Sequence, residues 1–491
     1  MTHRRDALAR RNPADERPED APRPLDPMDP AAALPMDTRT GIAPVAVTDR
    51  AEAAALVTDS LPRAIRRLAL PAVASSLLMT TFASADAYWV GTRIGGAGLA
   101  AVSISLFWIW MIVAIAEMVG IGLTAVAARR HGEGRHEAAA DATSDAVLLA
   151  LALGVVVGTL GTLYIDELFG LMRTPPDVTA LGRRYLAIYL LGAPLIFGFF
   201  AVDAAFRASG DTRTPLALLI VSVSIALVMD PVLILGLWGA PSFGIAGAAI
   251  ATIVTRSVVF VLGIVLLHRR GMVRWRRPHW LTLAAICRVG LPTAATGAFF
   301  SIIYVVLTRT TTQFGTPALA ALGVGHRVES WIYMIAVGFG AATAAVVGQN
   351  IGAGRIDRAA RAGWISVGYA MIPGGAVCLL MLLMPETLAT IFTDDPAVVR
   401  ETAAYLRIAA VAQVVLAFEV VLEGALGGAG HTVPPMLAST TLTALRIPLA
   451  VWAASVWGVN GIWWTLTITA IARAAAMGVI WHRGGWKRAR L

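Results

Sequence analysis

The chain has 491 residues, of which 57% are hydrophobic and 14% are charged, and its formal net charge is +9 at pH 7. Soluble domains carry about 25% charged residues, so this composition excludes an ordinary soluble protein and indicates one that lies mostly within a lipid bilayer. The basic excess does not indicate nucleic-acid binding, because the arginines occur in short runs between apolar stretches, as at 129–130 and 269–270.

The first 60 residues differ from the rest of the chain. They are rich in Pro, Arg, Asp and Ala and contain almost no aromatic residues, so they cannot bury enough apolar surface to offset the entropy lost on ordering. We therefore expect residues 1–60 to form a disordered cytoplasmic tail. Because this tail has no apolar run of about 7 to 15 residues, we do not expect it to act as a secretory signal.

Apolar stretches of about 20 residues, the length that crosses a bilayer, recur along the rest of the chain. Twelve such stretches predict twelve transmembrane helices. Their approximate centres are Leu77, Ile112, Gly154, Leu195, Ala226, Val254, Ile302, Ile335, Ala376, Ala412, Thr443 and Thr469.

The gaps between these predicted helices alternate in charge. Even-numbered gaps carry arginines, such as Arg129, Arg130 and Arg135, whereas odd-numbered gaps such as 237–244 carry few or none. Positive residues tend to remain on the cytoplasmic side of a membrane. The sequence therefore predicts a multi-pass protein of the cytoplasmic (inner) membrane with both termini in the cytoplasm.

The chain also repeats itself. Gly-Glu-Gly-Arg at 132–135 matches Gly-Ala-Gly-Arg at 352–355, a lag of 352 − 132 = 220 residues, and other motifs recur at the same lag. Since each repeat holds six helices, both repeats enter the membrane from the same side. The predicted fold is an all-α membrane protein with twelve transmembrane helices in two parallel six-helix repeats around a central cavity, which could open to either side by rocking.

This repeat divides the chain into five predicted parts. They are the tail (1–60), an N-terminal six-helix bundle (61–268), a cytoplasmic linker (269–282), a C-terminal six-helix bundle (283–482) and a basic cytoplasmic tail (483–491).

Several motifs carry a family resemblance that extends over residues 63–482. They are Leu70-Pro71 with Asp86 and Val90-Gly91 on the first helix, Arg207-Ala-Ser-Gly-Asp-Thr-Arg-Thr-Pro215 after the fourth, Asp230-Pro231 on the fifth, Gly244-Ile-Ala-Gly-Ala-Ala-Ile-Ala-Thr252 into the sixth, and Val347-Gly-Gln-Asn-Ile-Gly-Ala-Gly-Arg355 after the eighth. Together they resemble the multidrug and toxic compound extrusion (MATE) family of cation-coupled drug antiporters, in its prokaryotic type. The resemblance implies outward export of organic, often cationic compounds, driven by inward H⁺ or Na⁺, and a coupling-ion site built on the acids that match Asp86 and Asp230.

Carboxylates at membrane depth are costly unless they are paired, protonated or wetted. Asp86, Asp203 and Asp230 all fall in the first repeat, and carboxylates that share one poorly solvated pocket cannot all ionise. We therefore predict Asp86 and Asp230 as ion-coupling residues and Asp203 as a third. We prefer H⁺ to Na⁺, because Ala226 stands where the family often supplies an Asn oxygen.

The roles of Asp203 and Pro231 each leave alternatives open. Asp203, which lies about 10 Å along the helix from the turn at Gly210, either belongs to the acidic pocket, faces the wet cytoplasmic mouth or pairs with Arg207. Pro231 either lets the fifth helix bend as Asp230 changes charge or makes a static kink.

Polar residues elsewhere in the predicted helices are candidates for binding a substrate. They are Glu423, Glu419, Glu329 and Thr252. The three acids could hold a cationic substrate, but Arg446 or Arg327 could neutralise them instead, and we prefer this pairing. Glu117 on the second helix is a similar case for which the sequence names no partner.

Other chemistries find no support in the sequence. Cys287 and Cys378 lie among apolar residues, the histidines lack metal-ligand spacing, and no Gly-Lys-Ser/Thr phosphate loop occurs. We expect a secondary transporter and not an enzyme, with no metal and with no cofactor besides H⁺ or Na⁺ as coupling ion. Its expected partners are small organic molecules and the lipid bilayer, with no nucleic acid and no obligate protein partner.

The main alternative is a flippase for a lipid-linked precursor of the same broad superfamily. It would share the helical repeats but would need cationic side chains in the cavity to hold a pyrophosphate. The candidates are Arg256, Arg309, Arg446 and Arg473. A membrane-embedded hydrolase or transferase is a further alternative, for which the predicted helices supply no convergent nucleophile and base.

Overall fold

The computed structural model describes residues 55–489 except 95, 172–175 and 240. Side chains within 83–88 and 90–100 also lie outside the described part, as do most of the residues of the predicted tail. Every regular element among the described residues is a helix.

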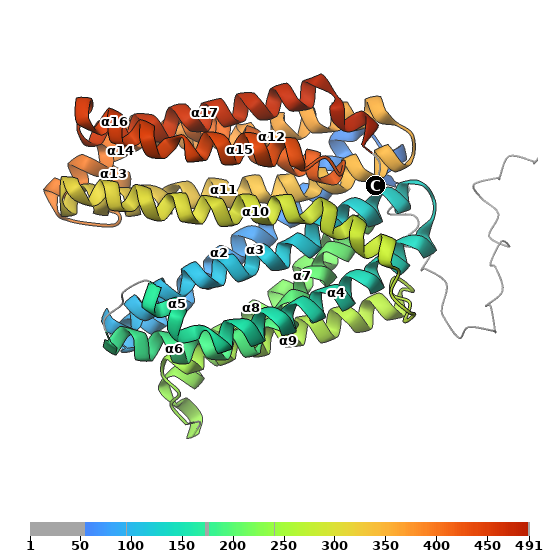
Figure 1. Cartoon of the computed structure of the whole chain (residues 1–491), viewed down its shortest axis with the longest axis horizontal. Coiled ribbons are helices and arrows are strands. Elements are labelled where there is room, and N and C mark those ends of the chain that lie inside the picture. The colour runs from blue at the N-terminus through green and yellow to red at the C-terminus, as the bar shows by residue number, and fades with distance from the viewer. Residues whose placement is uncertain (1–54, 95, 172–175, 240, 490–491) are drawn as a thin grey trace, which may run out of the picture. The chain divides into compact units, whose positions relative to one another are not determined.

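The helices follow the predicted repeat (Figure 1). Those of the first repeat are α2 (Leu61–Ile94), α3 (Gly96–Gly132), α4 (His136–Leu163), α5 (Ile165–Leu171), α6 (Pro176–Leu191), α7 (Ala193–Ser209), α8 (Arg213–Leu235), η1 (Leu237–Gly239) and α9 (Ile245–Arg269). Those of the second are α10 (Trp280–Thr311), η2 (Thr312–Phe314), α11 (Thr316–Gly352), α12 (Ile356–Leu383), α13 (Pro385–Thr390), α14 (Pro396–Gly428), α15 (Val433–Ala444), α16 (Arg446–Trp457), α17 (Val459–Arg483) and η3 (Gly485–Arg488).

Length and hydropathy confirm the membrane class. Within the described residues, ten helices are long and apolar enough to cross a membrane, and the α6–α7 pair makes an eleventh if its two parts, bent by 54°, form one span. The 34-residue helix α2 has the length for a twelfth. Every predicted centre lies inside one of these helices.

Two of the spans are broken at a proline. Pro194 is the second residue of α7, and Pro448 is the third residue of α16. Proline has no amide hydrogen to donate to the carbonyl four residues earlier, and its ring clashes with that carbonyl. The preceding segments, α6 and α15, therefore end just before these prolines.

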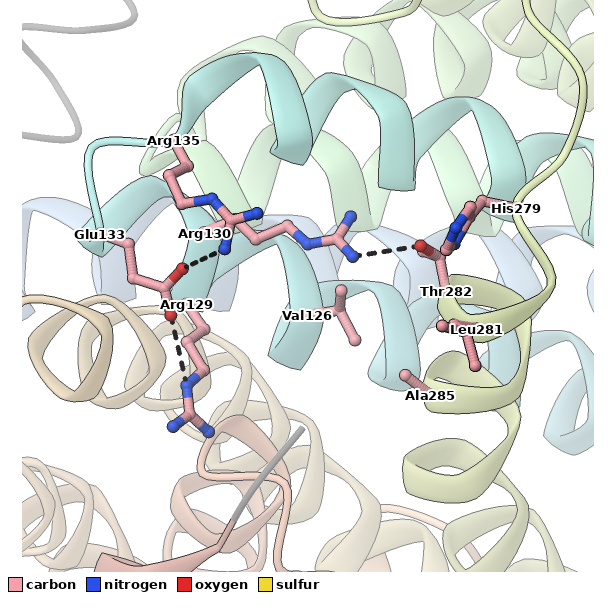
Figure 2. A pocket seen from close by; sticks show the side chains of 9 residues that line it. All are labelled: Val126, Arg129, Arg130, Glu133, Arg135, His279, Leu281, Thr282 and Ala285. Atoms are coloured by element: carbon pink, nitrogen blue, oxygen red, sulfur yellow. Dashed lines mark hydrogen bonds and ion pairs between the residues drawn. The ribbon is translucent and has the colours of Figure 1, made fainter.

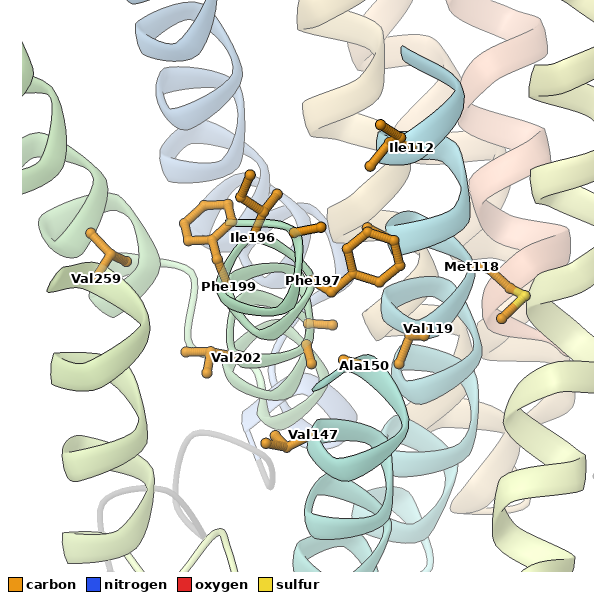
Figure 3. Close-up of a cluster of buried hydrophobic side chains, with 14 of the residues drawn as sticks. Ile112, Met118, Val119, Val147, Ala150, Ile196, Phe197, Phe199, Val202 and Val259 are labelled. Atoms are coloured by element: carbon orange, nitrogen blue, oxygen red, sulfur yellow. The ribbon is translucent and has the colours of Figure 1, made fainter. Parts of the chain in front are cut away.

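The core of the first repeat surrounds α7 (Figure 3). Phe197 and Val202 on α7 are fully buried, and α7 packs against α3, α4 and α9. Gly154 and Gly158 on α4 let the two backbones approach closely, because a Cβ at Gly154 would lie 2.4 Å from the Cα of Pro194. Apolar burial of this kind fixes the positions of the helices that carry the polar groups.

The two repeats interlock through their first two helices. α10 of the second repeat packs against α3 of the first, and α2 of the first packs against α11 of the second. A Cβ at Gly290 would lie 1.9 Å from the carbonyl oxygen of Met118, and one at Gly338 would lie 2.6 Å from the Cα of Val73. One helix of each repeat thus packs against the other repeat. The predicted bounds of the two bundles stay a prediction.

The loops at 133–135, 210–212, 270–279, 353–355 and 429–432 lie at one end of the helices, drawn at the right of Figure 1. We call it the basic end, after the arginines of these loops. There a Cβ at Gly132 would lie 2.0 Å from the carbonyl oxygen of Gln349, and one at Gly352 would lie 2.0 Å from that of Arg129. Since 132 + 220 = 352 and 129 + 220 = 349, the two contacts are repeat mates. We call this pair the glycine gate.

The first and last of the described residues each contact the other repeat at the basic end. Leu56, just before α2, is buried, and its carbonyl accepts a hydrogen bond of 3.3 Å from Asn350 in the second repeat. At the other terminus, Trp486 stacks on Trp481 with ring centroids 4.2 Å apart. Beyond Trp486, the carbonyl of Ala489 accepts a bond of 3.0 Å from Arg129 in the first repeat.

The turn between α7 and α8 is held by Asp211. Gly210 adopts the left-handed conformation with φ 100°, which favours glycine, and the Asp211 carboxylate then accepts bonds of 2.9 Å from the amides of Arg213 and Thr214 at the start of α8. Arg270, beyond α9, approaches the same carboxylate to 2.8 Å. Burial opposes ionisation of this carboxyl, but the bonds from Thr214 and Arg270 outweigh it and lower the pKa of Asp211.

Asp211→Asn should lower the midpoint of thermal unfolding by about 2 to 5 °C at pH 7, because charge-assisted bonds are lost. Since the pKa of Asp211 is lower in the folded state, its contribution is complete above the unfolded value of about 3.9 and is lost as the pH falls through the folded value. The gap to the wild type should therefore stay constant from about pH 7 to 5 and shrink below about pH 4. Asp357→Asn, at an exposed acid of the same end, is the control; a gap that widened with acid would contradict the assignment.

Candidate functional site

Asp230 lies on α8 and is fully buried. The helix α8 packs against α2, which carries Asp86, and against α9. The side chain of Asp86 lies outside the described residues, so the closeness of the two acids stays a prediction. Ala226, one turn before Asp230, is also buried and offers no side-chain oxygen.

Pro231 does not interrupt α8, which continues to Leu235 and ends at Gly236 in the left-handed conformation. Proline at this position still removes the amide donor to the carbonyl of Leu227. The bending role of Pro231 remains a prediction.

Asp203 forms an ion pair with Arg207, one turn later on α7. The side chain of Asp203 is 18% exposed, and Arg256 on α9 lies within electrostatic reach of it. Arg256 also stands over the ring of Phe199, 4.5 Å from its centroid. Of the three alternatives for Asp203, the structure shows the ion pair with Arg207. A role of Asp203 in ion coupling stays a prediction.

Glu419 on α14 is paired with Arg473 on α17 at 3.2 Å, and both side chains are buried. Sequence reasoning named Arg446 or Arg327 as the neutralising residue, and Arg473 takes this place instead. Arg446 is close enough to act on Glu419 electrostatically, but its Nε donates to the Thr469 hydroxyl at 2.7 Å. Arg446 and Arg473 both lie on other helices than Glu419, so the sequence alone does not decide between them.

Glu329 on α11 accepts two hydrogen bonds from α14. The hydroxyl of Tyr405 donates at 2.9 Å and the amide of Gln413 at 3.0 Å. His326, one turn earlier, lies 3.7 Å from the same carboxyl group. Glu329 thus belongs to a polar cluster between α11 and α14 and is not paired with the predicted Arg327.

Glu117 is the residue that sequence reasoning left without a role. It is exposed on α3, within a 25-residue candidate span, and lies within electrostatic reach of Asp203 and Arg207. Tyr333 on α11 is within reach of Glu117 and also of Glu423. A single acid in an apolar span is a sign of a functional residue. The groups near Glu117 could not be named, because they come from helices far apart in the sequence.

The two ion pairs and the side chains within electrostatic reach of them form one series of ionisable groups that crosses between the repeats. We call it the polar bridge, and its members are Asp203 and Arg207 on α7, Glu117 on α3, Tyr333 on α11, Glu419 and Glu423 on α14, and Arg473 on α17. Its two ends are ion pairs, and between them lie Glu117 and Glu423, which form no salt bridge within the part of the chain that the structure describes. Thr252 is separate from it: it is half-buried on α9, and its carbonyl accepts a bond of 3.0 Å from Thr255.

Among the residues that the structure describes, no group of three or more His, Cys, Asp and Glu side chains is placed to hold a metal ion. Cys287 and Cys378 are free thiols. The site is thus made of carboxylates, arginines and a phenol, which can bind ions and exchange protons.

The MatE family model matches the chain twice, over residues 71–232 and 292–452. The matches begin 292 − 71 = 221 residues apart and end 452 − 232 = 220 apart, the lag at which the motifs recur. The chain belongs to the MatE family. As a member of this family it is a secondary transporter and not an enzyme.

Two relatives match over more than nine tenths of their own length. A probable multidrug resistance protein NorM of Thermotoga maritima is 29% identical over 438 residues, which are 86% of this chain and 92% of that protein. The FAD transporter of Shewanella oneidensis is 26% identical over 423 residues, 84% of this chain and 93% of that one. A solved structure described as the outward-facing conformation of a multidrug resistance MATE family transporter of the MOP superfamily has a TM-score of 0.83 at 23% identity, over 89% of this chain and 98% of that one. This likeness confirms the predicted fold class.

Proposed function

We propose that this MatE family transporter exports organic cations and amphipathic compounds across the cytoplasmic membrane in exchange for protons. The basic end and both termini would face the cytoplasm, since the arginine-rich loops gather there. The multidrug resistance relative supports drug export, and the polar bridge is the observation that carries the mechanism.

The polar bridge supports coupling because it extends through both repeats. Neighbouring ionisable groups respond to one another's charge, more strongly away from water than in it. A charge change beside the Asp203–Arg207 pair would therefore act on Glu117, and Tyr333 lies within electrostatic reach of both Glu117 and Glu423. Substrate charge at one end and proton occupancy at the other can in this way influence each other.

The coupling carboxylates would be Asp86, Asp230 and Asp203. Asp230 supports a proton better than a sodium ion, because Na⁺ requires several oxygen ligands and Ala226 contributes none. A carboxyl group held away from water can also carry a proton in neutral form at little cost. Exchange of that proton between the two sides of the membrane would supply the energy of transport.

Alternating access would use the glycine gate. Close packing at Gly132 and Gly352 keeps the repeats together at the basic end, and the two contacts are equivalent by the repeat, so they can open as a pair. Opening of this gate would expose the polar bridge to the cytoplasm. Closing it would leave access from the opposite side.

The substrate would be held by the acids of the second repeat, Glu423 and Glu329, with Glu419 and Thr252 as further candidates. Glu423 is the strongest of them, because it is within electrostatic reach of the exposed Tyr333, and Glu419, one turn earlier on α14, is already neutralised by Arg473. An acid beside an aromatic ring suits an organic cation.

Export of an anionic compound is the second candidate, favoured by the FAD transporter among the relatives. It and the lipid-linked flippase both need unpaired cations. Arg473 is paired with Glu419, Arg256 lies beside Asp203, and Arg309 is exposed near the end of α10 opposite the basic end. Arg446 remains as one buried cation, which is less than a pyrophosphate requires.

Reconstituted vesicles with an imposed pH gradient should accumulate a cationic dye, whereas a sodium gradient of equal size should not. The assay would use the full chain, with FAD and a labelled lipid-linked sugar as competing substrates in parallel vesicles. Dye movement driven by sodium alone would overturn proton coupling. Movement of FAD or the lipid-linked sugar without movement of the dye would overturn the substrate class.

A further inference from the structure

A cationic pocket opens at the basic end between α3, α10 and the loop after α3 (Figure 2). It is lined by three apolar residues, one histidine, one threonine, one glutamate and three arginines, and the charged residues among them are Glu133, Arg129, Arg130 and Arg135. Three arginines therefore line a pocket that contains one carboxylate.

The arginines of this pocket are incompletely neutralised. Arg130 donates to the carbonyl of Ala138 at 2.7 Å and to the Thr282 hydroxyl at 3.1 Å, and both acceptors are neutral. Glu133 is shared, because it lies 3.6 Å from Arg129 and 3.2 Å from Arg135.

Two further acids lie within electrostatic reach of Arg130, namely Asp141 and Asp145. Both belong to α4 and approach Arg276 instead, at 3.0 and 3.8 Å. The Asp145 carboxylate also accepts a hydrogen bond from the backbone amide of His279. The pocket itself therefore keeps an excess of positive charge.

Comparison of the repeats shows that the fold does not require these charges. The mates of Arg129 and Arg130 at the lag of 220 are Gln349 and Asn350. Both amides are fully buried, and the Asn350 side chain holds the carbonyl of Leu56 by a bond of 3.3 Å. The same helix end is thus built with neutral side chains in one repeat and with arginines lining a pocket in the other.

The pocket lies at the level where the candidate spans end. The span of α3 ends at Gly132, and those of α4 and α10 begin at His136 and Trp280. Beside the pocket, Trp280 and Leu281 are 76% and 71% exposed. Exposed aromatic residues at span ends mark the headgroup region of a bilayer. The amides of the first turn of α10 add the positive end of a helix dipole.

We propose that this pocket binds the phosphate of an anionic phospholipid headgroup from the leaflet at the basic end. The guanidinium group of arginine can donate two parallel hydrogen bonds to phosphate oxygens. Basic pockets between transmembrane helices bind anionic headgroups in this way. The phosphate would lie between Arg130 on α3 and the start of α10, so it would connect the first repeat to the second beside the glycine gate. The acyl chains would follow the exposed apolar surface at Trp280 and Leu281.

The test uses purified full-length protein and measures the phospholipid that it retains by native mass spectrometry. Phosphatidylglycerol should be retained in preference to phosphatidylcholine. The variant Arg129→Gln with Arg130→Asn, which installs the residues of the second repeat, should weaken this binding about 25-fold, at about fivefold for each arginine. Arg130→Lys keeps the charge and should keep most of the preference.

Arg135→Gln is a second test of the site in case the double variant misfolds, because the Arg135 side chain is 67% exposed and its replacement should not disturb folding. It should lower the affinity about fivefold. Arg361→Gln, an exposed arginine of the second repeat, is the matched control and should change nothing. Equal phosphatidylglycerol preference in all variants would overturn the site. Protection against thermal unfolding by glycerol phosphate or inorganic phosphate, with none by phosphatidylglycerol, would overturn the lipid as its occupant.

Discussion

Asp230→Asn is expected to reduce proton-driven efflux to background while the protein still folds. The substitution keeps the shape of a fully buried side chain but removes the group that can bind and release a proton. The measurement is dye transport in vesicles with an imposed pH gradient, together with the proton release that substrate binding causes in detergent. Asp86→Asn should behave in the same way.

The matched control for this pair is Asp394→Asn, at an exposed acid in the loop after α13. It should transport like the wild type. If Asp230→Asn and Asp86→Asn kept coupled efflux, the first repeat would lose its proposed role as the coupling half. Loss of folding is recognised separately, by the elution profile and the unfolding midpoint of each variant.

Gly352→Val is expected to prevent closure of the glycine gate. The new side chain would begin 2.0 Å from the carbonyl oxygen of Arg129, and backbone cannot move aside as a flexible side chain can. An overpacking cost of about 1 to 3 kcal/mol would shift the balance between closed and open forms about 5- to 150-fold, and transport should fall with it. Gly132→Val, at the repeat mate, should have a similar effect.

Spin labels at positions 135 and 357, in a chain with Cys287 and Cys378 replaced by serine, would report the distance across the basic end. The distance distribution should move to longer values in Gly352→Val. Gly323→Val lies on the same helix, where a Cβ meets nothing within 4 Å, and should leave the distribution unchanged. An unchanged distribution in Gly352→Val would exclude the gate.

The helices and the repeat could be predicted because their signals are local or additive. A span of about 20 apolar residues is visible by itself, and a constant lag needs only two matching segments. The Asp203–Arg207 pair could be named for the same reason, since residues four apart on a helix are neighbours.

The partners across helices could not be predicted. Glu117 has no ionisable neighbour in its own span, and its closeness to Tyr333 and the Asp203 pair depends on how α3, α7 and α11 pack. Arg473 was missed in favour of Arg446 because the sequence contains no information on which face of α17 meets α14. The interlocking of α10 with α3 rests on glycines such as Gly290, whose role is to leave room and which carry no periodic signal.

The crossed anchorage of Leu56 and Ala489 has a practical consequence for handling this protein. The stretch around Leu56 is fastened to the second repeat, and Ala489 is fastened to the first. An affinity tag or fluorescent reporter fused directly after Ala489 would disturb the hydrogen bond between Arg129 and the Ala489 carbonyl. The carbonyl oxygen of Arg129 in turn contacts Gly352 in the glycine gate. Fusions with long, flexible spacers should preserve the natural turnover rate, and short rigid ones should slow it.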